Sequence, residues 1–346
     1  MKKKLKHSPL KYITMFRFLF ICFALPIITN AFSLHFNHKV PFICEVHDID
    51  VNDVEPEEMD QLRFLLKTTP VLVFKNQRID PRDQFRFCAE FDRQHTTDIV
   101  HPFGETAVPS CPQIALRGKG HIKDLFGVVD KPIRNFKAFE YTPVWHQDLV
   151  GTKDRYPTKI SSIYMLQPSK TGGSTLFASM EKAYENMGSN HKNYNTLQAC
   201  YSSKSGINAL MDHTGYGRID DQLKYNIETL KTLQDDLVIQ PLITYPDSSS
   251  RKKTLMLNPP KFCGFFGIPF EKSRTLMNSI MNEYVLTENN VGEVKYDQYD
   301  LAVYDNRRVI HSSTPTAAVE GSRIISLLLL DTREPFVPLI PPVFRS

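Results

Sequence analysis

A series of short apolar runs after Trp145, separated by turn-forming residues, limits the fold of this chain more than any other feature. Each run has the length of a single strand, and Pro, Gly and Asn recur between the runs. The runs occupy residues 160–167, 175–178, 237–244, 254–257, 301–304 and 324–330. Many short strands with such turns are typical of a β-sandwich or jelly roll and not of a doubly wound sheet.

Helical patterns flank these runs. Met59, Leu62 and Leu66, for example, recur at the spacing of one helical face. Helices are predicted over residues 55–67, 81–91 and 274–284, and a buried strand over 70–74. Residues 117–137 are polar and basic, which predicts a long surface loop or flap. We therefore expect a mainly β fold with flanking helices.

The overall charge gives no reason to expect a nucleic-acid partner. The formal net charge of +4 comes from 42 basic and 38 acidic residues, and lysines are concentrated in the first eleven residues. Without that start the body is nearly neutral, whereas binding to phosphates needs a basic face. The six cysteines form no CxxC pair, which disfavours a zinc knuckle or a redox dithiol. A homo-oligomer is compatible with the sequence.

The amino terminus has the pattern of a targeting segment. A lysine-rich start precedes an apolar run over 18–28, which is short for a membrane span, and small residues lead to Ala31. Residues 1–31 are therefore predicted to be a signal peptide, with a membrane anchor as the alternative and no stable membrane span after cleavage. Residues 32–57, which begin with Phe32, are predicted to be a transit segment or a linker. This arrangement favours the plastid of an alga with complex plastids, with secretion or the endomembrane system as the alternative.

A candidate metal site begins with His146 and Asp148, which lie two residues apart and would share one face of an extended strand. Such a pair is weak evidence by itself, but His311 supplies a third ligand near the carboxyl end. Two histidines and one carboxylate form the facial triad that leaves positions open on Fe(II) for a 2-oxo acid and O2. Arg323 follows on an apolar strand, where its guanidinium could grip the far carboxylate of 2-oxoglutarate.

Several ordered motifs make the chain resemble the taurine dioxygenase and 2,4-dichlorophenoxyacetate dioxygenase family from Glu58 to Glu334. The motifs are Val71-Leu72-Val73-Phe74-Lys75-Asn76-Gln77, His101-Pro102, Trp145-His146-Gln147-Asp148, Gly172-Gly173-Ser174-Thr175-Leu176-Phe177, Asp305-Asn306-Arg307 with His311, and Arg323. The resemblance implies a double-stranded β-helix, a form of jelly roll, over residues 58–335, followed by a tail over 336–346.

The same resemblance implies site roles and an activity. His146, Asp148 and His311 would ligate Fe(II), while Thr175 and Arg323 would bind 2-oxoglutarate. Thr175 could also be an ordinary strand threonine. The implied enzyme is a dioxygenase that uses O2 to oxidise an unactivated C–H bond, by hydroxylation, desaturation or ring closure, and releases succinate and CO2.

The substrate is the least constrained part of this interpretation. Taurine-type members carry a second arginine four residues after the cosubstrate arginine, and Leu327 stands at that position, which argues against taurine. His101, Lys137 and Tyr141 are candidate substrate contacts, although His101 could be only a loop residue. Cations over 117–137 would favour a small anionic, carboxylated metabolite if they faced the site, and would otherwise be a solvated surface.

Three alternatives remain open at this stage. A kainoid-type oxidative cyclase acting on a prenylated amino acid in secondary metabolism would fit an anion with an apolar tail. A non-catalytic jelly-roll binding protein would have the same fold, but it has no need for an intact ligand set. A zinc-dependent hydrolase could use the His146 and Asp148 pair, but it would need no grip for 2-oxoglutarate such as Arg323.

Overall fold

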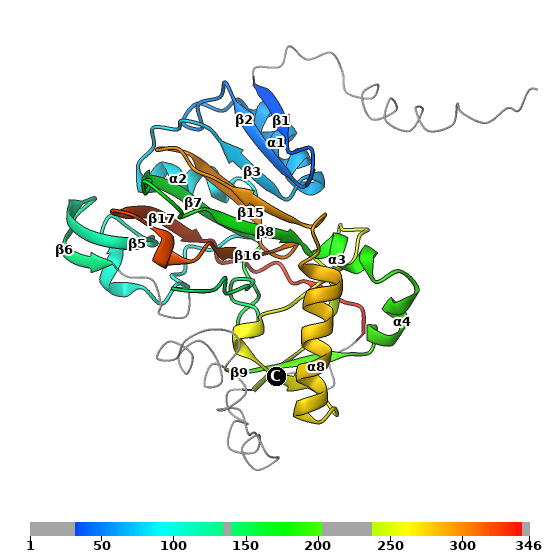
Figure 1. Ribbon diagram of the computed structural model, residues 1–346. Coiled ribbons are helices and arrows are strands. Elements are labelled where there is room, and N and C mark those ends of the chain that lie inside the picture. Colours follow the sequence, from blue (N-terminus) through cyan, green and yellow to red (C-terminus); the bar gives the residue numbers. More distant parts are fainter. Residues whose placement is uncertain (1–31, 134–139, 203–236, 341–346) are drawn as a thin grey trace, which may run out of the picture.

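The computed structural model describes residues 32–133, 140–202 and 237–340, and a large sheet runs through its centre (Figure 1). The strand order is β1-β2-β3-β15-β7-β17-β5-β4, with β6 paired to β5. These strands are β1 (Ser33–Phe36), β2 (Ile43–His47), β3 (Val71–Phe74), β4 (Ala107–Val108), β5 (Cys111–Leu125), β6 (Val128–Ile133), β7 (Ile160–Gln167), β15 (Leu301–Asp305) and β17 (Arg323–Leu329). All neighbouring pairs are antiparallel except β2 with β3.

A second sheet faces the central strands of the first. It consists of β14 (Val291–Val294), β8 (Thr175–Ser179) and β16 (Val309–Ser313), in that order. Phe177 and Val309 from this sheet form one buried apolar cluster with Ile163, Tyr304 and Ile325 from the large sheet. The expected mainly β sandwich is therefore confirmed.

The helices cover the other face of the large sheet and the far end of the molecule (Figure 1). They include α1 (Pro56–Thr68), α2 (Pro81–Ala89), α3 (Met180–Asn186), α4 (His191–Tyr194) and α8 (Phe270–Ser279), which continues into a π-helical segment over Ile280–Val285. Helix α2 begins where Asp80 accepts hydrogen bonds from two backbone amides of the first turn, with Pro81 next. Leu62 of α1 and Phe87 of α2 pack with Phe74 of the sheet.

Two further small sheets pack with α3 and α8 (Figure 1). One has the order β10 (Leu237–Pro241), β9 (Gln198–Ser202), β13 (Phe262–Phe265), and the other β12 (Thr254–Leu255), β11 (Ile243–Tyr245), β18 (Val337–Pro338). The predicted runs over 237–244 and 254–257 thus form strands, although the first is divided between two sheets. The predicted helix over 274–284 is present in α8 and its π-helical continuation.

Two predictions about local structure were wrong. Residues 117–137 do not form a loop as a whole, because β5 and β6 make a long antiparallel hairpin up to Ile133. Gly118 and Gly120 interrupt its apolar alternation, with φ angles of +131° and +138°, so charged residues on the exposed face dominate the pattern. Residues 32–57 are not a separate transit segment or linker, because β1 and β2 extend the large sheet. The fold therefore begins before Glu58.

The state of the cysteines and the character of the helices can be stated for the described residues. The five described cysteines are free and buried: Cys44, Cys88, Cys111, Cys200 and Cys263. Within the described ranges, no helix combines the length and the hydrophobicity required to cross a membrane. The predicted signal peptide over 1–31 lies outside these ranges.

Candidate metal centre

Two backbone segments that are distant in sequence bring His146, Asp148 and His311 together. His146 and His311 form an isolated antiparallel bridge, in which the amide of each donates to the carbonyl of the other, at 2.9 and 3.0 Å. Nε2 of His146 lies 3.8 Å from Oδ1 of Asp148, and Nε2 of His311 lies 3.7 Å from Oδ2. The structure thus assembles the three predicted ligands at one point, where they could hold a metal ion.

The local backbone differs from the expected strand. His146 makes only the single bridge, and Asp148 lies in a turn that continues through Leu149, whose φ is 59°. Asn306 stabilises this turn, since its Oδ1 accepts from the Asp148 amide at 2.7 Å and its Nδ2 donates to the Asp148 carbonyl at 2.9 Å. Ser161 also donates to Oδ2 of Asp148 at 3.0 Å. The carboxylate is therefore oriented by neighbours before any metal is bound.

The surroundings of both imidazoles suit metal ligation. Nδ1 of His146 lies 2.8 Å from the carbonyl oxygen of Val144, so it donates there and leaves the Nε2 lone pair free to coordinate. Burial lowers the pKa of His311 to about 3, although the Asp148 carboxylate acts in the opposite direction. His311 is therefore a neutral donor at physiological pH. Two imidazoles and one carboxylate fit the donor set of a facial triad for Fe(II).

Tyr304 is a member of the site that the sequence analysis missed. Its hydroxyl lies 3.4 Å from Oδ2 of Asp148 and 3.4 Å from Nε2 of His311. Burial, together with the Asp148 charge, raises its pKa well above the usual value, so the phenol stays protonated and can donate to the carboxylate. The only sequence signal for Tyr304 was its position directly before the Asp305-Asn306-Arg307 motif.

The candidate cosubstrate residues lie along the edge between the two sheets. Arg323 begins β17, is 5% exposed, and donates from Nε to the carbonyl of Gly173 at 2.7 Å. Thr175 begins β8 and is also buried. Tyr296 interacts with both: burial raises the pKa of its hydroxyl to about 12, whereas Thr175 and the Arg323 charge act to lower it. Because Nε of Arg323 is bonded to Gly173, the two terminal nitrogens of its guanidinium can bind a carboxylate. Tyr296 is a second residue near the site that the sequence did not indicate.

The three candidate substrate contacts have different locations. His101 is 6% exposed, with Nε2 2.8 Å from the Pro112 carbonyl and Nδ1 accepting from the Phe103 amide at 3.2 Å, so both ring nitrogens have backbone partners. Tyr141 is 62% exposed. Lys137 lies outside the described residues. Trp145, in contrast, is buried in an apolar cluster and is a packing residue.

Comparison with known proteins agrees with this geometry and places the chain in a class of oxygenases. The model of the family described as "Taurine catabolism dioxygenase TauD, TfdA family" matches residues 35–328. The chain is 22% identical over 273 residues to the alpha-ketoglutarate-dependent dioxygenase cnsP of Penicillium expansum, covering 78% of this chain and 67% of that protein. It is also 22% identical over 274 residues to the alpha-ketoglutarate-dependent sulfonate dioxygenase of Saccharomyces cerevisiae, of which it covers 60%.

A solved structure shows the same fold. A taurine dioxygenase from Burkholderia xenovorans superposes with a TM-score of 0.63 at 17% identity, covering 91% of this chain and 96% of that one. The protein is thus an Fe(II)- and 2-oxoglutarate-dependent dioxygenase, which uses Fe(II), 2-oxoglutarate and O2. It belongs to the TauD, TfdA family, as the sequence motifs indicated.

Proposed function

We propose that this dioxygenase oxidises an unactivated C–H bond of a small anionic metabolite, with Fe(II) held by His146, Asp148 and His311. The convergence of these side chains from separate segments is the observation that supports the proposal most strongly. When bound, Fe(II) with 2-oxoglutarate and O2 supplies the oxidising power, and 2-oxoglutarate is converted to succinate and CO2. The protein contributes the positions of the ligands, the cosubstrate and the substrate.

Arg323 and Thr175 would orient the cosubstrate. The guanidinium of Arg323 is fixed through Nε by Gly173, so it can present its remaining donors to a carboxylate without losing further conformational freedom. Tyr304 would hold Asp148 through its protonated hydroxyl, and Asn306 would hold the turn that carries it. These contacts would keep the three ligands in place around the metal.

Arg117 supports an anionic substrate. It lies directly opposite Ile325 in the β5–β17 pair, so its side chain shares a sheet face with Ile325, which packs with Phe177 and Tyr304 beside the triad. Its guanidinium stacks over Phe103 at 3.9 Å. Burial lowers its pKa to about 10, yet it remains charged at neutral pH.

This cation would replace the second arginine that taurine-type enzymes carry at the position of Leu327. The yeast relative is named a sulfonate dioxygenase, and sulfonates are anions, which favours an anionic substrate here as well. A carboxylated metabolite remains the class that we propose. Ring closure of a prenylated amino acid is a narrower possibility within this class, because Phe103 supplies an apolar surface beside the charge.

The iron assignment is tested with protein loaded anaerobically with Fe(II) and 2-oxoglutarate. The unmodified protein should show the weak visible charge-transfer band of a chelated 2-oxo acid, and His146→Ala, Asp148→Ala and His311→Ala should each abolish it. His121→Ala is the matched control, because His121 is exposed and pairs with Asp130 at 3.1 Å on the distal hairpin. Retention of the band in all three ligand variants would show that the triad is misassigned.

The substrate assignment is tested by screening candidate metabolites for succinate release when air is admitted. Carboxylated compounds should be turned over faster than their neutral isosteres, and Arg117→Gln should remove this preference mainly by raising the substrate KM. Lys123→Ala, an exposed cation farther along β5, should leave the preference unchanged. Equal turnover of charged and neutral isosteres by the unmodified enzyme would contradict an anionic substrate.

We also propose that residues 1–31 are a signal peptide, and that the destination is the plastid of an alga with complex plastids, in which case Phe32 and the strand residues after it would have to serve as the transit signal as well. Phe32 is 6% exposed and packs in the core, so cleavage after Ala31 would keep the described fold complete. A fluorescent reporter fused to residues 1–40 should enter the plastid. Delivery to the secretory route would support the alternative destination, and a cytosolic reporter with intact Met1 would contradict both.

A further inference from the structure

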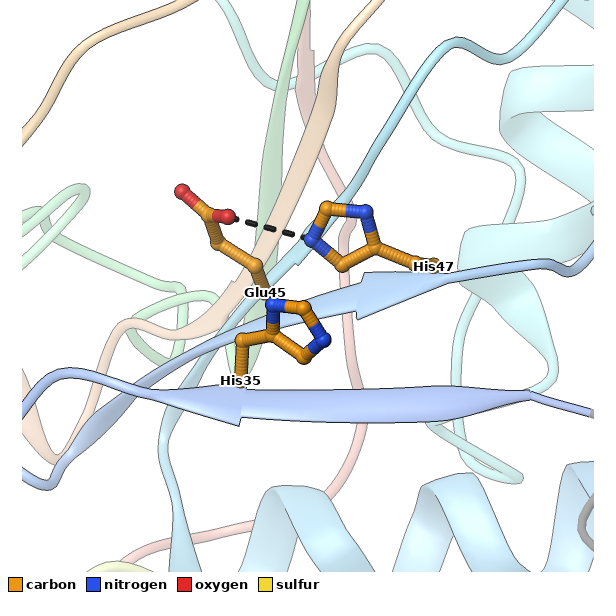
Figure 2. A group of neighbouring side chains, drawn as sticks. All are labelled: His35, Glu45 and His47. Atoms are coloured by element: carbon orange, nitrogen blue, oxygen red, sulfur yellow. Dashed lines mark hydrogen bonds and ion pairs between the residues drawn. The ribbon is translucent and has the colours of Figure 1, made fainter.

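A second set of metal-ligating side chains lies at the edge of the large sheet, on strands that carry no member of the iron triad. His35 of β1 and Glu45 of β2 are directly opposite each other in the antiparallel pair, and His47 follows two residues after Glu45. All three side chains therefore project from the same face, as Figure 2 shows. This set results from the strand register and is not visible in the sequence as a motif.

The distances are those of a nearly formed site. Nε2 of His47 lies 3.1 Å from Oε2 of Glu45, and the rings of His35 and His47 are 4.4 Å apart with an interplanar angle of 30° (Figure 2). One ligand atom from each residue lies within 4.8 Å of the other two. In a tetrahedral zinc site, bonds of about 2.0–2.1 Å place ligand atoms about 3.3 Å apart. Small rotations of side chains at the surface would close the remaining gap.

The donor set is the same as that of the iron triad, namely two imidazoles and one carboxylate. In the part of the chain that the structure describes, these are the two groups of three such ligands that come together. The surroundings differ, because His35 is exposed and Glu45 and His47 are half-buried, whereas the triad lies between the two sheets. A metal at the edge would keep water in its remaining position and would not be enclosed with a cosubstrate.

We propose that His35, Glu45 and His47 bind a zinc ion at this edge, with water as the fourth ligand. Imidazole and carboxylate suit Zn²⁺, which tolerates the geometry that a strand pair imposes. β1 is only four residues long, is mostly exposed, and pairs with β2 alone. Zinc would therefore tie the outermost strand to the sheet and protect an open edge, which is a structural role independent of the proposed oxidation.

The test counts zinc bound to the metal-free full chain, prepared without a histidine tag, by native mass spectrometry and by titration calorimetry. Because the iron triad also accepts zinc, the decisive measurement uses the His146→Ala/His311→Ala background. We expect two zinc ions per unmodified chain and one in this background. Adding His35→Ala/His47→Ala should reduce the count to none, and should also abolish the rise in unfolding temperature that zinc produces in the background.

His38→Ala is the matched control, because His38 is an exposed histidine in the loop after β1 and belongs to neither ligand set. It should retain the single zinc. The proposal is overturned if the background chain binds no stoichiometric zinc, or if its zinc persists after both His35 and His47 are replaced. Either result leaves the iron assignment unaffected, because the triad is absent from these variants, and the visible band of the unmodified enzyme tests the triad separately.

Discussion

Replacement of Arg323 by alanine should raise the requirement for 2-oxoglutarate steeply. Arg323 is 5% exposed, and its Nε is fixed by the Gly173 carbonyl at 2.7 Å. Lys119, directly opposite in the strand pair, cannot substitute, because its ammonium donates to the carbonyls of Thr316 and Val319 at 3.4 and 2.8 Å. A cosubstrate carboxylate in the variant would therefore lose its charged partner without replacement.

The size of the expected rise in the KM for 2-oxoglutarate follows from the burial of the Arg323 charge. Loss of one partner from a buried hydrogen-bonded charge pair costs about 2 to 5 kcal/mol. At about 1.4 kcal/mol for each factor of ten, the apparent KM for 2-oxoglutarate should rise about 30-fold to about 4,000-fold. Arg323→Lys should lie between the unmodified enzyme and the alanine variant, because it keeps the charge and loses the paired donors.

The assay measures succinate formation against 2-oxoglutarate concentration at saturating substrate, with thermal unfolding as a check on the fold. Lys119→Ala is the matched control and should shift the apparent KM only slightly. An Arg323→Ala variant that is folded and has an unchanged 2-oxoglutarate dependence would refute the assignment of this residue to the cosubstrate.

Three further substitutions have expected outcomes. Asn306→Ala should prevent stoichiometric Fe(II) binding, measured anaerobically, because the turn carrying Asp148 loses its hydrogen bonds and each buried group left unpaired costs about 1–3 kcal/mol. Arg308→Ala should lower the free energy of unfolding in urea by about 3–5 kcal/mol, since the buried Glu181 carboxylate loses its two hydrogen bonds from Arg308 at 2.8 and 2.9 Å and keeps only the more distant Lys252 ammonium at 4.0 Å among the ion pairs of the described residues. Gly173→Ala should raise the apparent KM for 2-oxoglutarate, because its φ is +78° and an added Cβ would lie 2.6 Å from Cδ of Arg323.

Those parts of the fold that depend on local pattern could be predicted from the sequence. The strands at 160–167 and 324–330 have long apolar runs, and both are present as β7 and β17 with nearly the predicted bounds. The β5–β6 hairpin could not be recognised, because Gly118 and Gly120 replace apolar residues at alternate positions. A loop and a glycine-interrupted strand have the same local pattern, and only the pairing with β17 distinguishes them.

In the candidate site, too, residues in local motifs could be predicted, whereas residues placed by strand pairing could not. His146, Asp148, His311 and Arg323 could be proposed because they occur in motifs at known spacing. Tyr304 could not, because its role depends on which strand faces which across the sandwich. Arg117 appeared only as one of several basic residues, and its inward direction depends on the register of β5 against β17. Register is a property of paired strands and is only weakly encoded in either strand alone.

The two ligand sets show that burial and support, and not donor type, determine what a metal can do in this fold. In the iron triad, Asp148 is held by Ser161 and by Asn306, and the bridge between His146 and His311 fixes the backbone at the two histidines. These contacts would give a bound metal ligands in fixed positions, with Arg323 and Thr175 placed to orient a cosubstrate.

At the edge, His35, Glu45 and His47 are positioned by the register of β1 and β2 and by contacts with one another, and solvent reaches all three. A metal there gains no enclosed space in which to orient a second molecule. The same two imidazoles and one carboxylate can therefore support oxidation between the sheets, whereas the role that we propose for them at the edge is to tie one strand to the next.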